Sequence, residues 1–214
     1  MKEVSPQTTD QATVRPPLSD RISERAWKVY LRLRVHPSSQ TFGIRGYLHP
    51  HEGRFLYWLA GQIPIGGLAL EVGSFMGKSG SFIAEGLPRS GQLVCVDTWA
   101  NDAMPYDAPL DTYPEFLSNV APYLDRIKPV RSQSEDLASR WDRPIDMLFI
   151  DGDHSYEGCR RDCLSWMGFV RSGGWIAFHD SGQEGVKRTI HECLPGSMRK
   201  CEVRVWSIFA AKVR

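Results

Sequence analysis

The stretch A-L-E-V-G-S-F-M-G-K-S, residues Ala69 to Ser79, joins an apolar run to an acid and two glycines. Its last three letters match the end of a phosphate-binding P-loop, but a P-loop has four residues between its glycines, and three separate Gly73 from Gly77. The dinucleotide motif G-x-G-x-x-G places its second glycine two residues after the first, where this chain has Phe75. Neither phosphate motif fits, and what remains is a strand end with an acid, followed by the start of a helix.

From residue 68 onward, short apolar runs alternate with segments of helical periodicity. The runs are apolar throughout, as in parallel strands covered on both faces, and their alternation with helices indicates a doubly wound sheet. A tight turn at Trp206 and Ser207 joins the last two runs, so we expect an antiparallel hairpin there. The predicted fold is α/β with a mostly parallel, seven-stranded sheet. The expected strands are Leu68–Val72, Leu93–Asp97, Ile127–Val130, Asp146–Ile150, Trp175–His179, Val203–Trp206 and Ile208–Lys212, and the expected helices are Ser79–Gly86, Tyr113–Leu124, a short turn at Glu135–Leu137, Tyr156–Val170 and Gly185–Cys193.

The sequence before this domain divides into two parts. Residues 1–18 are polar and carry three prolines, which predicts a mobile tail. Residues 19–66 are predicted to form a helical extension, in which Ser19 and Asp20 are suited to cap the first helix. The main domain is then expected over residues 67–214. The apolar positions with helical spacing are Ile22, Ala26, Val29 and Leu33 in the first helix, and Phe55, Leu56, Leu59 and Ala60 in the second.

The composition excludes several classes of protein. A formal net charge of +1 and the absence of any run of Lys and Arg argue against a nucleic-acid partner. No apolar segment approaches the ~18 residues of a membrane-spanning helix, and the N-terminus lacks the apolar segment of an export signal. The five cysteines form no C-x-x-C pair, which indicates reduced thiols. These features predict a cytoplasmic protein without nucleic-acid or membrane partners.

Polar or acidic residues follow each of the five predicted parallel strands, and ligands of open α/β sheets bind beyond these carboxyl ends. Asp97 lies 24 positions after Gly73, where a carboxylate can accept the two hydroxyls of a ribose. Glu71 adds negative charge beside Gly73, which disfavours a pyrophosphate and favours a cationic group. Adenosine attached to a group that bears a cationic amine points to S-adenosylmethionine, whose carboxylate can sit at a helix N-terminus.

Five segments in order carry a family resemblance: L-E-V-G-S-F-M-G-K-S, V-D-T-W, S-Q-S-E, F-I-D-G-D-H-S-Y-E and I-A-F-H-D. With them the chain resembles class I S-adenosylmethionine-dependent methyltransferases, from roughly Gly53 to its end. It is most similar to small bacterial O-methyltransferases related to catechol and macrolide-sugar O-methyltransferases. The resemblance implies a Rossmann-like methyltransferase fold and methyl transfer to a hydroxyl of a small-molecule or sugar-like acceptor.

The resemblance also implies a role for each matching residue at the cofactor. Glu71 would hold the methionine amino group, Gly73 would let the backbone approach the cofactor, and Ser79 at the helix N-terminus would take the carboxylate. Asp97 would bind the ribose hydroxyls. The adenine would lie between Ser132 and Gln133, and Asp151 would border the same site.

For the reaction, the resemblance implies a catalytic pair and a metal site. Asp151 and the pair His179–Asp180 correspond to the positions that hold Mg²⁺ in related enzymes, and His154 corresponds to the base of the sugar methyltransferases. His179 departs from the acid found in the relatives. An imidazole there shifts the preference from Mg²⁺ toward Mn²⁺, Fe²⁺ or Zn²⁺. Loss of the metal, with His179 acting alone, is an alternative that the sequence leaves open.

A long segment after the second predicted strand is a candidate lid or acceptor-recognition loop, because long loops in compact domains are often functional. Its notable side chains are Trp99, Asp102, Tyr106 and Asp107. Packing of the N-terminal helices against a second copy of the chain is a further arrangement that the sequence allows.

Three other functions compete with a base-assisted O-methyltransferase. A catechol-type enzyme would require a metal held by both Asp151 and Asp180. An S-adenosylmethionine-binding protein without catalysis would bind the cofactor and methylate no acceptor. An NAD-dependent oxidoreductase is disfavoured by Phe75 and by the missing third glycine.

Overall fold

The structure is a computed structural model, and it describes residues 24–102 and 110–214. The described residues form a seven-stranded sheet in the order β3-β2-β1-β4-β5-β7-β6. Strands β1 to β5 pair in parallel, whereas β7 is antiparallel to both β5 and β6. The predicted α/β fold and its terminal hairpin are therefore confirmed. The strands are β1 (Leu68–Val72), β2 (Gln92–Asp97), β3 (Ile127–Arg131), β4 (Ile145–Ile150), β5 (Val170–Phe178), β6 (Arg199–Val205) and β7 (Ile208–Val213).

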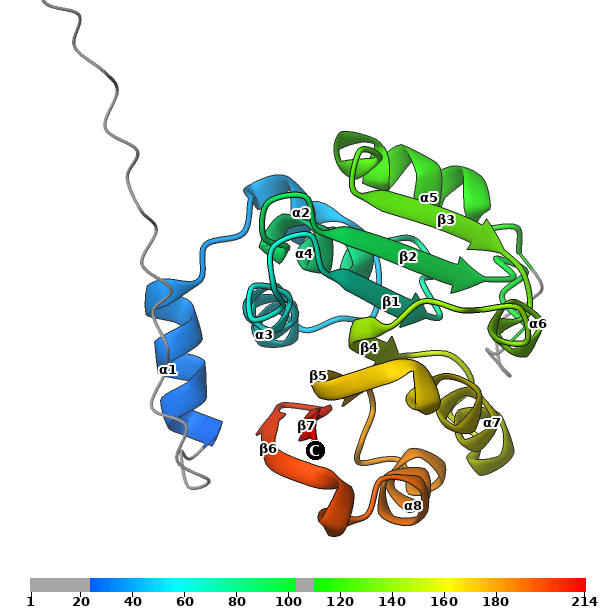
Figure 1. Cartoon of the computed structure of the whole chain (residues 1–214). Helices are drawn as coiled ribbons and strands as arrows, with labels where there is room; N and C mark the ends of the chain where they lie inside the picture. The colour runs from blue at the N-terminus through cyan, green and yellow to red at the C-terminus, as the bar shows by residue number, and fades with distance from the viewer. Residues whose placement is uncertain (1–23, 103–109) are drawn as a thin grey trace, which may run out of the picture.

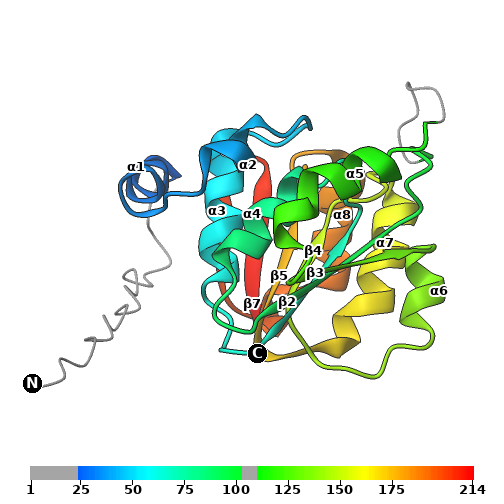
Figure 2. The same cartoon turned by 90° about the horizontal axis from the view of Figure 1, so that it is seen from above.

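Helices cover both faces of the sheet (Figures 1 and 2). On one face, α1, α3, α4 and α5 contribute to one hydrophobic cluster, and on the other face α6, α7 and α8 contribute to a second. Side chains of a strand alternate between the two faces, so Ala69 packs into the first cluster while Leu68 and Leu70 pack into the second. The helices are α1 (Glu24–Arg34), α2 (Ser39–Gly43), α3 (Pro50–Ala60), α4 (Lys78–Gly86), α5 (Tyr113–Val120), α6 (Ser134–Ala138), α7 (Tyr156–Trp166) and α8 (Glu184–Cys193), with 3₁₀ turns at 121–123, 167–169 and 196–198.

Several predicted boundaries differ from the structure, among them those around residue 170. The helix expected over Tyr156–Val170 ends at Trp166, and a 3₁₀ turn leads into β5 at Val170. Strand β5 therefore begins earlier than predicted. The prediction missed this start because Arg171 and Ser172 are exposed and interrupt the continuous apolar pattern of a buried parallel strand. At its C-terminal side β5 ends at Phe178, so that His179 and Asp180 lie just beyond the strand.

The first helix buries a different face from the one that its apolar spacing marks. Trp27 and Leu31 are buried, whereas Val29 and Leu33 are 54% and 66% exposed. The ring of Trp27 meets Trp58 of α3 edge to face, with ring centroids 4.8 Å apart. The large indole ring decides the buried face because it removes more apolar area from water than the smaller side chains do. Ile22, the proposed cap at Ser19 and Asp20, and the predicted tail at 1–18 lie outside the described residues.

None of the helices among the described residues is long and apolar enough to cross a membrane.

Helices α3 and α4 approach each other closely because glycines lie at their contact. A Cβ on Gly86 would lie 2.1 Å from the carbonyl oxygen of Tyr57, and one on Gly53 would lie 2.5 Å from the ring of Phe82. The first clash is with backbone, which cannot rotate away. This contact fixes α3, and with it Glu52 in its first turn, relative to the sheet.

We predict that Gly86→Ala lowers the free energy of unfolding by about 2 kcal/mol or more, because the added methyl must push two helices apart. The measurement is urea unfolding followed by circular dichroism. Gly43→Ala is the matched control, since Gly43 also ends a helix but a Cβ there meets nothing within 4 Å. Equal stability of the two variants would contradict the account of this contact.

Candidate active site

Glu71 is a buried carboxylate at the end of β1. Its side chain is 0% exposed, and one oxygen, Oε2, accepts hydrogen bonds from the Ser74 hydroxyl at 2.7 Å and the Cys95 thiol at 3.2 Å. The other oxygen, Oε1, is buried and accepts no hydrogen bond from any described residue. Burial raises the pKa of Glu71 to about 7. An acid with an unused, buried oxygen is suited to receive a donor or a cation from a ligand.

Gly73 lies where the loops after β1 and β4 touch. Its φ angle is +81°, and a Cβ there would lie 2.2 Å from the carbonyl oxygen of Asp151. Both the left-handed backbone and the contact require glycine. The contact brings Glu71, near the end of β1, and Asp151, which follows β4, to one place at the sheet edge.

The loop continues into α4, whose first turn contains Ser79. Ser79 is buried. The next residue, Gly80, lies close to Glu71, and a Cβ on Gly80 would be 3.0 Å from the Glu71 carboxylate. The N-terminal end of α4 is therefore packed beside Glu71. The free backbone N–H groups of a helix start favour a negatively charged ligand group.

Asp97, at the end of β2, is held by backbone groups. Its Oδ2 accepts from the amides of Ser74 and Phe75 at 2.7 and 2.9 Å, and its Oδ1 accepts from the amide of Trp99 at 2.6 Å. These three bonds fix the loop after β1 to the end of β2. A carboxylate has about four acceptor positions, so one remains for a ligand hydroxyl.

Ser132 and Gln133 follow β3 next to Asp97, whose carbonyl oxygen accepts from the Ser132 amide at 3.0 Å. Ser132 is half-buried, and Gln133 is exposed at the N-terminal end of α6. The predicted cofactor residues Glu71, Gly73, Ser79, Asp97, Ser132 and Gln133 thus all lie along one edge of the sheet, at the ends of β1, β2 and β3.

Trp99 does not belong to an exposed recognition loop. Its side chain is 0% exposed, packs against Tyr113 and Phe116, and donates from Nε1 to the carbonyl oxygen of Phe75 at 2.9 Å. The apolar ring is more stable in the core under α5 than at the surface. Asp102 is exposed, while Tyr106 and Asp107 lie outside the described residues.

A second group of side chains gathers beyond β4 and β5. His154 lies between two carboxylates, with its Nε2 3.5 Å from Asp151 Oδ1 and its Nδ1 3.5 Å from Asp180 Oδ2. His179 Nδ1 lies 3.1 Å from the same Asp151 oxygen and 3.5 Å from Asp180 Oδ2. The structure therefore brings together the four residues predicted for catalysis and metal binding.

The carboxylates control the charge of both histidines. The hydrogen bond to Asp151 raises the pKa of His154 above its ordinary value. Burial lowers the pKa of His179, but Asp151, Asp180 and Glu52 outweigh this effect and raise it overall. Each imidazole is consequently a better proton acceptor than a free histidine.

Glu52 is the site residue that the sequence analysis missed. It lies in the first turn of α3, is 2% exposed, and its Oε2 lies 3.3 Å from His179 Nε2. The same oxygen accepts from the His49 amide at 2.8 Å, as in a capping box. The spacing H-P-H-E, with an acid three residues after the cap, was the available signal for a helix start. Its contact with a residue 127 positions away had no such signal.

The donor set of this group fits a divalent cation. One ligand atom each from Asp151, His154 and His179 lie within 4.8 Å of one another. Ligands bound to one cation at roughly 2.0–2.1 Å lie about 3.0–3.4 Å apart, and Asp151 Oδ1 lies 3.1 Å from His179 Nδ1 and 3.5 Å from His154 Nε2. A donor set that includes imidazole nitrogen suits Zn²⁺, Mn²⁺ or Fe²⁺ better than Mg²⁺, which prefers oxygen ligands.

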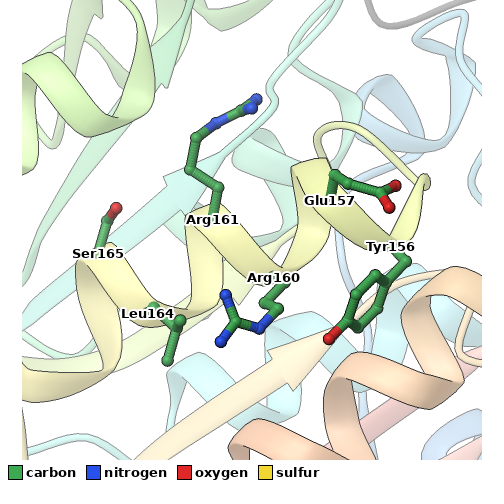
Figure 3. A pocket seen from close by; sticks show the side chains of 6 residues that line it. All are labelled: Tyr156, Glu157, Arg160, Arg161, Leu164 and Ser165. Carbon is green, nitrogen blue, oxygen red and sulfur yellow. The ribbon is translucent and has the colours of Figure 1, made fainter.

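A surface hollow lies away from these residues (Figure 3). It has a volume of about 490 Å³ and follows the outer side of α7, where the labelled side chains project from a single helix. None of the predicted site residues lines it. Its lining residues are Tyr156, Glu157, Arg160, Arg161, Leu164 and Ser165.

Comparisons with known proteins agree with this fold. A family model described as a methyltransferase domain matches residues 70–181, more than half of the chain. A protein from Corynebacterium glutamicum has a similar structure, with a TM-score of 0.67 and 14% identity over 88% of this chain and 96% of that one. An O-methyltransferase from Bacillus cereus, solved with S-adenosylhomocysteine (SAH), has a TM-score of 0.64 and 17% identity over 89% and 100% of the two chains. TomG from Streptomyces achromogenes, an O-methyltransferase of tomaymycin synthesis solved with S-adenosylmethionine, has a TM-score of 0.63 and 19% identity over 91% and 100%.

We predict that Asp97→Asn destabilises the protein by about 1–3 kcal/mol, because an amide nitrogen would replace one acceptor oxygen and leave a backbone N–H unpaired. Thermal unfolding in the absence of ligands measures this effect. Asp102→Asn is the control, since Asp102 is exposed and accepts from the Thr98 hydroxyl. A stability unchanged by Asp97→Asn would mean that the loop after β1 does not depend on this carboxylate.

Proposed function

The chain belongs to the methyltransferase-domain family, and on that premise we propose that it transfers the methyl group of S-adenosylmethionine to a hydroxyl oxygen of a small-molecule or sugar-like acceptor. The observation that carries the proposal is the position of His154 between the carboxylates of Asp151 and Asp180. This base lies across the Gly73 contact from the buried acid Glu71. A cofactor held by the first group and an acceptor held by the second would meet at the sheet edge. That the two similar structures named above are O-methyltransferases supports oxygen as the acceptor atom.

For the cofactor, we assign the methionine amino group to Glu71. Its free oxygen Oε1 would accept a charged N–H, which offsets the cost of burying the carboxylate. The methionine carboxylate would bind at Ser79 and the start of α4. The remaining acceptor position of Asp97 would take a ribose hydroxyl, and Ser132 with Gln133 would border the adenine. Asp151, in contact with Gly73, would face the methyl-bearing sulfur.

For the reaction, His154 accepts the proton of the acceptor hydroxyl. The oxygen forms a bond to the methyl carbon while the carbon–sulfur bond breaks, and the electron pair returns to the sulfonium to give neutral SAH. Asp151 and Asp180 orient the imidazole and stabilise the imidazolium that forms. Asp151, His179 and Asp180 would hold a divalent cation, which when bound lowers the pKa of a coordinated hydroxyl.

The test of this proposal is transfer of radioactive methyl from S-adenosylmethionine to a panel of catechols, phenols and sugars, with a thiol and an amine as controls. We expect methylation of at least one hydroxyl compound, with the label in a methyl ether by mass spectrometry. Labelling of the thiol or amine alone would exclude O-methylation. Binding of SAH without transfer to any compound in the panel would favour the binding-protein alternative. Activity that disappears with chelator, returns with metal and persists in His154→Gln would favour the catechol-type alternative.

We predict that His154→Gln lowers kcat by about 10²–10⁴-fold, the usual contribution of a general base, and leaves SAH affinity within a factor of two or three. The amide preserves the size and polarity of the side chain but cannot accept the proton. Steady-state kinetics with the acceptor found above, together with calorimetry, separate the two effects. His191→Gln serves as the control, because His191 lies in the last turn of α8 and outside the site. Full activity of His154→Gln would remove His154 from the mechanism.

The raised pKa of Glu71 gives a second prediction. A cationic amino group binds the ionised carboxylate, so SAH affinity should rise as the pH increases through about 7. If binding requires the ionised form, affinity at pH 8 should exceed that at pH 6 by about tenfold. Glu71→Gln should weaken binding at pH 8 and remove most of this dependence. Calorimetric titration across this pH range is the measurement, and a wild-type affinity that does not change with pH would contradict the role of Glu71.

The contribution of Glu71 to folding stability should fall as the pH rises, whereas SAH affinity should increase. Because the pKa of Glu71 is higher in the folded protein than its ordinary value of 4.5, the folded state holds the proton more strongly. Its contribution is most favourable below pH 4.5 and is lost as the pH rises to about 7. The difference in stability between wild type and Glu71→Gln should therefore change across this window.

A further inference from the structure

We propose that Glu52 is a positioning residue of the centre formed by Asp151, His154, His179 and Asp180. By fixing His179, it makes this centre select a zinc- or manganese-class cation over Mg²⁺. This inference deepens the proposed function and rests on it for the location of the reacting groups. It concerns the helical extension before the matched family region, since Glu52 lies in α3 and the match begins at residue 70.

Both oxygens of Glu52 are fully used. Oε1 accepts from the Ser207 amide at 3.0 Å and the Ser207 hydroxyl at 2.5 Å. Oε2 accepts from the His49 amide at 2.8 Å and faces His179 Nε2 at 3.3 Å. Each oxygen of this buried carboxylate thus has two polar partners. A buried carboxylate with such a set of partners can remain ionised.

The contact with Glu52 fixes Nε2 of His179 as a protonated nitrogen, because an ionised carboxylate only accepts hydrogen bonds. Nδ1 faces Asp151 and Asp180, 3.1 and 3.5 Å away. Nδ1 would donate to these carboxylates without a cation and would lose its proton to bind one. A metal-ligating histidine has this arrangement, in which a carboxylate holds the N–H of the other nitrogen and increases the basicity of the ligand. Glu52 thus makes Nδ1 of His179 a strong nitrogen ligand.

The nitrogen ligands determine the class of cation. With His179 fixed, a cation held by Asp151, His179 and Asp180 gains an imidazole nitrogen, and imidazole suits Zn²⁺, Mn²⁺ and Fe²⁺. Mg²⁺ requires near-octahedral oxygen ligands and retains several waters. An imidazolium that bridges Asp151 and Asp180 without any metal would have similar distances, and it is the alternative against which the experiment is designed.

Glu52 also connects the centre to two other elements. Ser207 lies in the β6–β7 turn, where the ring of Trp206 stacks on His49 with centroids 4.1 Å apart. The Trp206 amide donates to Glu24 of α1 at 3.1 Å. Glu24 and Glu52 therefore bind adjacent residues of the same turn, but of these two only Glu52 faces His179. This pair provides a matched control.

The experiment is titration of the metal-stripped, full-length protein with Co²⁺, followed by visible absorption, and with Zn²⁺, Mn²⁺ and Mg²⁺ by calorimetry. We expect the wild type to bind Co²⁺ and Zn²⁺ at least tenfold more tightly than Mg²⁺. Glu52→Gln should weaken Co²⁺ binding by about 10–100-fold, the usual effect of losing such a partner, and should change the Co²⁺ spectrum. Glu24→Gln should remain within twofold of the wild type, because it loosens the turn without touching His179.

Two outcomes overturn the proposal. One is a wild type that binds none of these cations, as the imidazolium arrangement requires. The other is Glu52→Gln with the affinity and spectrum of the wild type. SAH affinity is measured on the same samples to separate failure of the metal proposal from failure of the proposed function. A wild type that does not bind SAH would reject the methyltransferase site itself, whereas SAH binding without these metal effects would reject only the role of Glu52.

A second pair of variants keeps the proposal testable if Glu52→Gln folds poorly. His179→Asp alone would place a carboxylate against Glu52 and should destabilise the protein by like-charge repulsion. Combining it with Glu52→Gln should recover stability and shift the preference toward Mg²⁺, since the nitrogen ligand is gone. Additive losses of stability in the double variant, without any shift in preference, would show that Glu52 does not act through His179.

Discussion

The absence of a side chain at Gly73 is the constraint on which the rest of the site depends. The loops after β1 and β4 touch through backbone atoms there, and a single Cβ would overlap the carbonyl of Asp151 at 2.2 Å. Because β1 and β4 are neighbours in the sheet, this contact brings the buried Glu71 at the end of β1 near the residues proposed for the reaction after β4. Asp97 then fixes the β1 loop from the β2 side through three backbone amides. The proposed cofactor and the proposed base are brought together by these contacts alone.

Two buried glutamates differ in a way that explains their proposed roles. Glu52 has donors on both oxygens, and its pKa is lowered. Glu71 has an oxygen with no donor among the described residues, and its pKa is raised to about 7. The hydrogen bonds of Glu52 all come from this chain, and we propose that this carboxylate orients His179. One oxygen of Glu71 has no such partner in the part of the chain that the structure describes, and a cationic ligand group would provide it. Burial alone does not distinguish these roles, but the inventory of donors does.

The sequence was sufficient to predict the fold and the location of most residues of the candidate site. Apolar runs located the strands, and the polar residues after them located Glu71, Asp97, Asp151 and Asp180 at one edge, because parallel strands end at the same side of a sheet. Three features depended on long-range packing and were not predictable from local patterns. Trp99 is buried under α5, although its acidic neighbours suggested a surface loop. The face that α1 buries is set by Trp27 against Trp58. The contact of Glu52 with His179 joins segments that are far apart in the chain.

Amide hydrogen exchange of the whole protein, with and without SAH, tests the central claim most directly. If the cofactor lies across the ends of β1, β2, β3 and β4, SAH should slow exchange in residues 71–79, 97–101, 131–134 and 150–153. The hollow along α7 should not change. Protection by NAD in place of SAH, or protection by SAH confined to α7, would contradict the account of this sheet edge.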